Sequence, residues 1–428
     1  MPRRPVTTHD NAILPYFYSS TAAAASLLYR GKPSVGDWYV MVRRGQTAIL
    51  HIPNETLEGP GTRYLNWLKE GEKQFTDDFL RMGRDLRKMG DAMQERLKKD
   101  RATGAISDIS EWYPEYRVLT GTEIGIGYSL ERVFDLHFQK QGIQVSELPI
   151  NFLSFSMEES LALQKLFETV PAAERDQVLK EHAEHYSWIL NDWMGTEEVT
   201  VQYLKRRHLP LQRMNQTFTD YLAKKPATLE GWAGAVAQMR DLRIKCEQIA
   251  ASLADRYLRQ ECEKYRCRYE EAVMYTVEEF DALKADGLPK TDPVRLMHIH
   301  PDGVTTMTQD EWNQIAGTSD QQLVGRCANP GKVVGKARIV LSRYDFHKVQ
   351  DGDILVTAMI RPEFAQTLSR CAGLITNEVG ITSDAPLLSR GLGLPCVIDT
   401  VSATRMFRDG DLLDLDADNG IVTLLKKG

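Results

Sequence analysis

The 428-residue sequence lacks paired cysteines, long apolar runs and a large net charge. Its six cysteines are scattered without a CxxC pair, so a metal or redox site has no support. A formal net charge of −6 gives no reason to expect nucleic acid or an anionic membrane as a partner. The basic residues 1–5 precede no apolar segment, and Arg30 interrupts the short alanine-rich stretch after residue 21. We therefore expect no signal peptide, no membrane span, and a cytoplasmic location with reduced thiols.

What the chain contains is ordinary for a globular protein. The hydrophobic fraction is 42% and the charged fraction is 26%. The length suffices for two or three domains with a sizeable core.

The most informative stretch lies near the C-terminus. Residues 372–376 are apolar and short, which predicts a buried strand, and residues 385–390 predict a helix that Gly391 and Gly393 end. Thr382, Ser383 and Asp384 would then lie at a helix N-terminus, where unpaired N–H groups favour an anion such as phosphate. Simple N-capping by a serine or aspartate explains the same pattern.

Residues from about 325 to the C-terminus resemble the mobile phosphohistidine domain of the phosphoenolpyruvate-utilising enzymes. That family includes phosphoenolpyruvate synthase, pyruvate phosphate dikinase and the rifampin phosphotransferases. The resemblance implies a swivelling α/β domain over residues 321–428, behind a mainly helical, substrate-binding domain over residues 1–320. The matching segments are 329–338, 351–357, 361–364, 380–390, 393–397, 403–404, 409–411 and 414–420.

One residue departs from the family pattern. The family loop reads Thr-Ser-His-Ala, and its histidine carries the phosphoryl group, whereas this sequence has Asp384 there. A carboxylate is a weaker nucleophile than imidazole, although aspartyl phosphates exist. Three explanations stay open: an engineered replacement of histidine, a natural loss that leaves a binding fold, or a new catalytic acid or base.

The resemblance also implies roles for neighbouring residues. Asp384 takes the carrier position, and Thr382 and Ser383 shape its loop. Arg361 and Arg390 would lie at the rim and bind an anionic substrate. A carboxylate beside these arginines would form a salt bridge, which could hold the two domains together.

The N-terminal region has a mixed pattern. Strands are predicted at 37–42 and 47–52, and residues 59–61 break the pattern. An apolar stripe from Phe75 to Leu97 predicts an amphipathic helix, and further helices are expected at 127–136, 158–169, 172–188 and 229–268. The glycine-rich segment 121–127 lacks the context of a phosphate loop and is interpreted as turn backbone. Residues 295–300 alternate like a strand.

Two histidines in this region are candidate substrate contacts. His182 and His185 belong to a His-x-x-x-Tyr-x-Trp stretch that resembles the helical domain of standalone phosphoenolpyruvate-synthase-like proteins. Their spacing also places them on one helix face, as in some metal sites, but no third ligand can be assigned and we predict no metal. Solvated helix residues are the simpler interpretation.

Two classes of function follow. The first is a phosphotransferase-like enzyme for a small organic acid or natural product, or a divergent lyase, dehydratase or isomerase with Asp384 as acid or base. The second is a non-catalytic binding subunit. No segment is assigned to ATP binding, so no cofactor is expected within the chain. ATP and Mg²⁺ would require a separate ATP-binding partner, and a homo-oligomer stays open.

Overall fold

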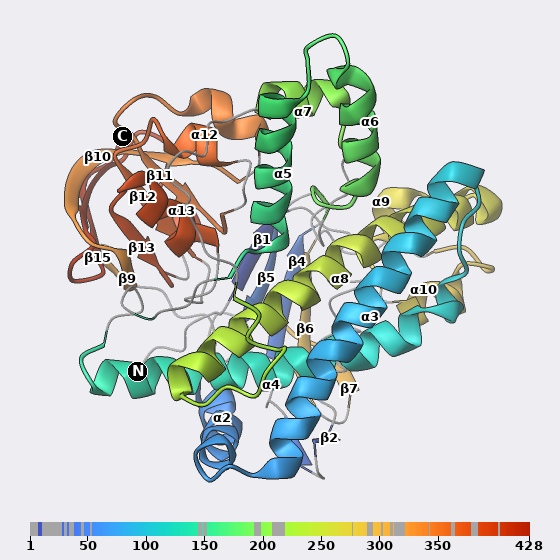
Figure 1. Cartoon of the computed structure of the whole chain (residues 1–428), viewed down its shortest axis with the longest axis horizontal. Coiled ribbons are helices and arrows are strands. Elements are labelled where there is room, and N and C mark those ends of the chain that lie inside the picture. The colour runs from blue at the N-terminus through green and yellow to red at the C-terminus, as the bar shows by residue number, and fades with distance from the viewer. Residues whose placement is uncertain are drawn as a thin grey trace.

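The computed structural model contains a helical unit and a C-terminal sheet unit (Figure 1). The predicted boundary at residues 320 and 321 lies outside the described residues. The structure describes residues 7–10, 28–29, 32–33, 38–43, 47–51, 54–143, 148, 152–191, 198–207, 219–275, 277–288, 294–300, 303–308, 311, 322–341, 343–360, 364–377, 384–400 and 403–428.

Helices dominate the first unit, as the sequence predicts. The apolar stripe from Phe75 to Leu97 lies buried along one long helix. Two further long helices cross it in Figure 1, and a pair of helices, α5 and α6, projects from the unit. The helical segments are α2 (Asn54–Lys69), α3 (Lys73–Thr103), η1 (Ile109–Glu111), α4 (Tyr113–Lys140), α5 (Phe155–Thr169), α6 (Arg175–His185), α7 (Val201–Arg207), α8 (Leu229–Tyr265), α9 (Tyr269–Ala272) and α10 (Val277–Leu283).

A five-stranded antiparallel sheet belongs to the same part of the chain. Its strand order is β1-β5-β4-β6-β7, so the predicted hairpin of β4 and β5 and the predicted strand near 295–300 are confirmed. The strands are β1 (Thr7–Asp10), β4 (Trp38–Arg43), β5 (Thr47–His51), β6 (Val294–His300) and β7 (Gly303–Thr306), and β2 (Leu28–Tyr29) pairs separately with β3 (Lys32–Pro33).

Helix α4 overturns one prediction. Residues 121–127 are not turn backbone, because they continue α4 without a break. Glycine disfavours a helix by about 1 kcal/mol relative to alanine, but burial on several sides outweighs that local cost. At Gly127 a Cβ atom would approach the Glu123 Oε1 atom to 2.6 Å, so the glycine makes room for a buried carboxyl group.

Residues 59–61 lie inside α2 rather than in a loop. The close approach of the α2 and α4 backbones explains the glycine at position 61. A Cβ atom on Gly61 would lie 2.1 Å from the Ser129 carbonyl oxygen of α4, so only glycine lets the two backbones come this close.

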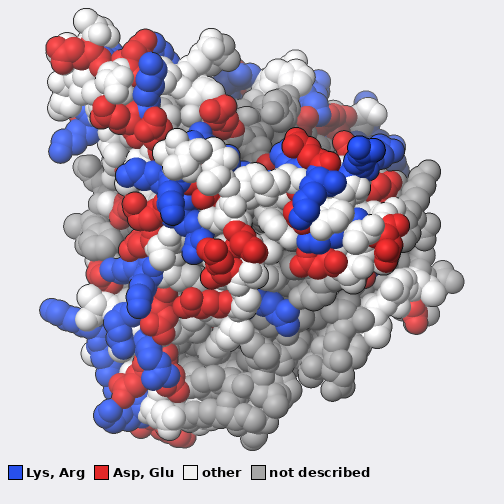
Figure 2. Space-filling model, turned by 90° about the vertical axis from the view of Figure 1, so that its right-hand side faces the viewer, with Lys and Arg blue, Asp and Glu red and all other residues white. Residues whose placement is uncertain are grey.

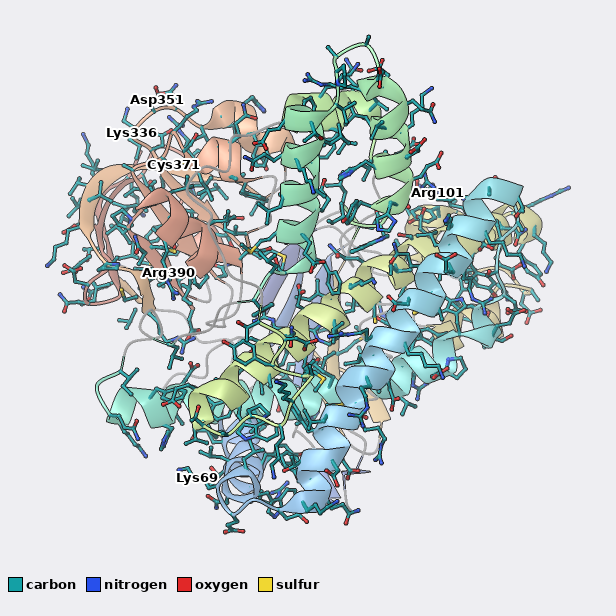
Figure 3. All side chains as sticks on the ribbon, in the orientation of Figure 1. Lys69, Arg101, Lys336, Asp351, Cys371 and Arg390 are labelled. Carbon is teal, nitrogen blue, oxygen red and sulfur yellow. The ribbon has the colours of Figure 1, made fainter. Side chains whose placement is uncertain are left out.

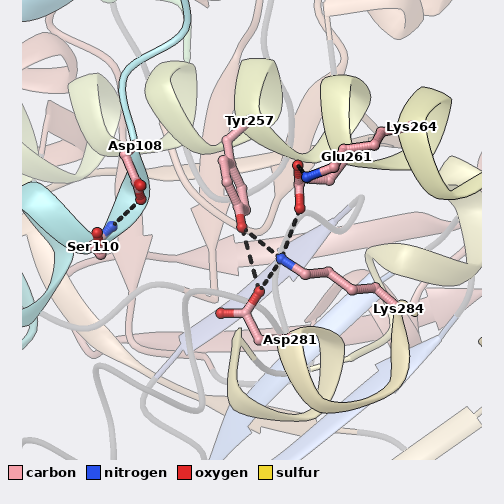
Figure 4. Close-up of polar contacts among 7 residues, drawn as sticks. All are labelled: Asp108, Ser110, Tyr257, Glu261, Lys264, Asp281 and Lys284. Carbon is pink, nitrogen blue, oxygen red and sulfur yellow. Dashed lines mark hydrogen bonds and ion pairs between the residues drawn. The ribbon is translucent and has the colours of Figure 1, made fainter. Parts of the chain in front are cut away.

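Helix α8 is the central element of the helical core. Buried side chains occur on all of its faces, as expected for a helix covered by neighbours all round. Near its C-terminal end, the Lys284 Nζ atom lies 3.0 Å from the Tyr257 hydroxyl oxygen, 2.7 Å from Glu261 Oε2 and 2.8 Å from Asp281 Oδ1 (Figure 4). Burial lowers the pKa of Lys284, but these hydrogen bonds outweigh it and raise that pKa. This network fastens α10 to α8.

The C-terminal unit is built on an eight-stranded mixed sheet. Its order is β8-β15-β14-β10-β11-β12-β13-β9, and β10 to β13 run parallel. The strands are β8 (Gln322–Val324), β9 (Arg326–Asn329), β10 (Lys332–Ile339), β11 (Ile354–Thr357), β12 (Gly373–Thr376), β13 (Cys396–Ile398), β14 (Leu412–Asp416) and β15 (Ile421–Lys426).

Two apolar cores stabilise this unit. One contains Leu355 and Leu374 with Phe364 and Leu388, and the other joins the parallel and antiparallel strands around Phe407. The helices are η3 (Arg343–Lys348), α12 (Ala365–Leu368), α13 (Asp384–Leu392) and α14 (Ala403–Met406). The predicted strand at 372–376 and helix at 385–390 are confirmed, although Gly391 lies inside α13 and Gly393, with φ of 66°, follows its end.

The described surface carries charges of both signs. Basic and acidic side chains are interspersed over the described part of the face in Figure 2. Among the described residues, no helix is long and apolar enough to cross a bilayer.

Candidate functional site

The carboxyl ends of the parallel strands form a polar edge on the C-terminal unit. Asn377 follows β12 directly, is fully buried, and donates through Nδ2 to the Thr404 hydroxyl at 2.6 Å. The Thr400 hydroxyl donates to the Thr376 carbonyl oxygen at 2.8 Å. In sheets of this kind, ligands bind outside the carboxyl ends of the strands.

Asp384 begins α13 at this edge. It is the first helical residue and is partly buried. The helix dipole favours a negative charge at that position. Thr382, Ser383 and Arg361 lie outside the described residues, so their predicted roles stay predictions.

The charge of Asp384 affects the pKa of Asp241, which lies on α8 across the interface. Burial is the main cause that raises the pKa of Asp241 well above its ordinary value, and the charge of Asp384 raises it further. The Phe155 backbone N–H donates to Asp241 Oδ2 at 3.1 Å, which favours the ionised form and partly opposes the shift. The structure thus brings together two carboxyl groups that are 143 positions apart in the chain.

Lys245 lies one helical turn after Asp241. Its ammonium group is nearly buried, lies 2.8 Å from Asp91 Oδ1, and stands over the Phe155 ring at 4.8 Å. The charge of Lys245 lowers the pKa of Asp241 and also that of the nearby Glu158, whose pKa is nevertheless raised by burial. The charges that surround Asp241 are therefore Asp384, Glu158 and a lysine already bound to another carboxylate.

The two predicted histidines differ in their surroundings. His182 is buried, with Nε2 3.0 Å from Glu159 Oε1, so the solvated interpretation is wrong for this residue. His185 is exposed at the end of α6, as that interpretation predicts. The Tyr186 ring lies 4.7 Å from the His182 ring and 4.6 Å from the His185 ring. Burial raises the pKa of Tyr186, and the charges of Glu159 and Glu158 raise it further. The charge of Glu158 therefore raises the pKa of both Tyr186 and Asp241.

Arg390 lies at the other end of α13. Its Nε donates to the Ala328 carbonyl oxygen of β9 at 3.4 Å, and burial lowers its pKa. Figure 3 labels it on the C-terminal unit. The side chain is thus bound within its own unit, and its predicted substrate contact stays a prediction.

A different arginine bridges the two units. The buried guanidinium of Arg326 on β9 forms an ion pair through Nη1 with Asp135 Oδ2 on α4. Its Nε lies 3.4 Å from Asp399 Oδ2, in the segment that follows β13. This interdomain ion pair is not the predicted one between Asp384 and Arg361 or Arg390, which stays a prediction.

Buried charges continue from this contact along α4 and α8. Arg243 of α8 binds Glu123 of α4 at 2.5 Å between Nε and Oε2, and Arg240 lies 3.6 Å from Glu131. Burial raises the pKa of Glu123 to about 7, although the charge of Arg243 opposes this shift. Glu123, Glu131 and Asp135 recur at multiples of four residues, so they share one face of α4.

Sequence reasoning missed Asp241, Arg326 and Asp135. A weak signal existed for Asp241, because charged residues follow closely after the apolar run 232–237 on a helix that is buried on all sides. Among the described residues, no group of three or more metal-binding side chains occurs.

Comparison with known protein families matches part of the C-terminal unit. Residues 349–420 match the family described as PEP-utilising enzyme, mobile domain. A probable phosphoenolpyruvate synthase of Archaeoglobus fulgidus is 40% identical over 100 residues, covering 23% of this chain and 13% of the relative. Phosphoenolpyruvate synthase of Pyrococcus furiosus is 32% identical over 134 residues, covering 31% and 16%.

Two other similarities are more limited. Chondramide synthase cmdD of Chondromyces crocatus is 33% identical over 106 residues, covering 25% of this chain and 3% of the relative. A crystal structure of aconitase X from Thermococcus kodakaraensis covers 24% of this chain and 98% of its own, with 19% identity and a TM-score of 0.20, which supports no argument.

The chain spans only a small share of the length of these curated relatives. The matched residues 349–420 include strands β11 to β14 and helix α13, which begins at Asp384. Residues 349–420 of the C-terminal unit therefore match the mobile domain of PEP-utilising enzymes, and this part of the chain is similar to the corresponding part of phosphoenolpyruvate synthases.

Proposed function

We propose that the protein is an enzyme that transfers protons on a small organic acid or natural product bound between its two units. Asp384 and Asp241 serve as the acid–base pair. The single observation that carries the proposal is the position of Asp384, whose charge raises the pKa of Asp241 across the interface.

Two carboxyl groups with different environments suit this chemistry. Asp384 is the first residue of α13, where the helix dipole favours a negative charge, and a carboxylate there can accept a proton. Asp241, with its raised pKa, favours the protonated form, which can donate one. Two carboxyl groups in different environments are a common basis for assigning the base and the acid. Lyase, dehydratase and isomerase reactions all need such a pair.

The same charges disfavour the ancestral chemistry. A phosphoryl group on Asp384 would add negative charge near Asp241 and Glu158, and the nearby Lys245 already binds Asp91. Like charges at short range in a partly buried site repel strongly. In this proposal the chain needs no cofactor of its own.

The family match favours a second candidate, a phosphotransferase-like protein that acts with a separate ATP-binding partner. ATP and Mg²⁺ would then enter through that partner. Its C-terminal unit would swivel between sites, and this movement would separate Asp384 from Asp241 and break the Arg326–Asp135 ion pair.

The test measures proton exchange. Candidate carboxylic acids are incubated with the protein in deuterated water, and deuterium incorporation is followed by nuclear magnetic resonance. We expect Asp384→Asn and Asp241→Asn each to slow exchange by about 10²- to 10⁴-fold, the usual contribution of a general acid or base. Asp351→Asn is the matched control, because Asp351 is 89% exposed on the same unit.

A phosphate-transfer assay distinguishes the acid–base enzyme from the phosphotransferase-like protein. Labelled phosphate is supplied as phosphoenolpyruvate or as ATP with the ATP-binding partner. Its transfer to the Asp384→His variant would support the phosphotransferase-like protein. If the wild-type chain itself takes up label on Asp384, the acid–base proposal is wrong. Folded Asp384→Asn and Asp241→Asn variants with unchanged exchange rates would also contradict it.

A further inference from the structure

A separate groove lies between α3 and α4. Its volume is about 510 Å³, in the range of pockets that hold small molecules. All of its lining residues come from these two helices, and none comes from the C-terminal unit. The groove is therefore distinct from the interdomain carboxyl pair.

The base of the groove is apolar. Phe75, Phe79 and Met82 of α3 and Ile126 of α4 line it and are at most 7% exposed. Val118 of α4 also lines the groove and is 51% exposed, which is unusual for a large aliphatic side chain in this protein. An apolar base with an exposed valine favours a ligand with a hydrocarbon part.

The rim carries excess negative charge. Asp78, Asp85 and Glu115 line the groove together with one cation, Arg81. Arg81 already forms an ion pair with Asp78, at 2.5 Å between Nη2 and Oδ1. Asp85 and Glu115 are both exposed and leave two negative charges at the rim.

We propose that this groove binds a small amphiphilic cation, a hydrocarbon chain or ring system that carries an ammonium group. The hydrocarbon part lies against the Phe75, Phe79 and Ile126 side chains, and the ammonium group lies at the rim near Asp85 and Glu115. The apolar base supplies most of the affinity, because burying hydrocarbon surface is the main favourable contribution. The carboxylates select the sign of the ligand's charge.

The test compares three ten-carbon probes of different charge by calorimetric titration below their micelle concentrations. Decyltrimethylammonium should bind about 2- to 30-fold more tightly than decanol, because each exposed ion pair contributes about 0.2–1 kcal/mol. Decyl sulfate should bind more weakly than decanol. The stoichiometry should be one probe per chain.

Two variants locate the site. Val118→Lys places a cation at an exposed position of the rim and should remove the preference for the ammonium probe over the sulfate. Val334→Lys is the matched control, because Val334 is 55% exposed but lies on β10 of the C-terminal unit. Thr122→Trp should fill the groove and weaken all three probes by about tenfold or more.

Three results would overturn the proposal. They are equal affinity for the three probes, the same response in Val118→Lys and Val334→Lys, and unchanged binding in a folded Thr122→Trp variant. Asp384→Asn should bind the probes like the wild type. The outcome is therefore independent of the function proposed for the interdomain site.

Discussion

The Arg326–Asp135 ion pair provides the sharpest test of how the two units are joined. Replacing Arg326 with methionine keeps much of the side-chain volume but removes the guanidinium. Asp135, whose side chain is 5% exposed, would then be a buried carboxylate without its cationic partner. Breaking a buried pair in this way costs about 3–5 kcal/mol.

The loss converts into a measurable shift of the melting temperature. Unfolding entropy is about 2.1 cal/mol/K per residue, which for 428 residues is roughly 0.9 kcal/mol/K. If the chain unfolds as a unit, we expect Arg326→Met to lower the Tm by about 3–6 °C in a calorimetric scan. The double variant Arg326→Met/Asp135→Leu should recover at least half of this loss, because no buried charge is stranded at Asp135.

A matched variant separates interdomain docking from general stability. Arg338 binds Asp353 at 2.7 Å within the C-terminal unit, so Arg338→Met removes an ion pair that does not cross the interface. Only Arg326→Met should increase the radius of gyration in small-angle scattering. A fully stable Arg326→Met chain, or equal expansion in both variants, would refute the idea that this arginine holds the units together.

Three further predictions concern the helical unit. Glu123→Gln should flatten the pH dependence of the free energy of unfolding measured in urea. The pKa of Glu123 is raised from 4.5 to about 7 in the folded protein. The stabilisation that its protonated form provides is therefore present below about pH 4.5 and is lost as the pH rises towards 7. An unchanged slope in that window would contradict the assignment. Lys284→Met should lower the free energy of unfolding in urea by about 1–3 kcal/mol, since three hydrogen bonds of Figure 4, two partly buried and one exposed, are lost. Lys73→Met is the control, because the Lys73 side chain is 88% exposed in its ion pair, and it should leave the free energy of unfolding nearly unchanged. Gly61→Ala should cost about 1–3 kcal/mol because its Cβ would meet the α4 backbone, while Gly59→Ala, which has open space, should be neutral or stabilising. Equal effects of the two glycine variants on thermal unfolding would show that the packing of α2 on α4 is looser than described.

Local patterns predicted most of the elements but not how they meet. The strand at 373–376, the helix after Asp384 and the long α3 follow from apolar spacing and from glycine at their ends. The segment 121–127 was predicted wrongly, because its glycines serve close packing inside a helix, and that need arises only in the folded protein.

The candidate site was predictable only in part. The family pattern pointed to Asp384, since it stands where a histidine is expected. Asp241 lies on a helix far away in the sequence, and its raised pKa depends on burial and on the charge of Asp384. The sequence suggested a salt bridge of Asp384 with Arg361 or Arg390 and not the Arg326–Asp135 pair, since Arg326 and Asp135 are common residue types whose pairing depends on docking.

The glycines of α4 have a consequence for how the chain folds. A 28-residue peptide with glycine at positions 121, 125 and 127 has low intrinsic helicity, since each of them costs about 1 kcal/mol relative to alanine. The segment gains its conformation from α2, which is synthesised before it, and from α8, which is synthesised after it. We expect α4 to remain largely non-helical on the ribosome until residue 265 has emerged, so the helical unit closes late and in one cooperative step.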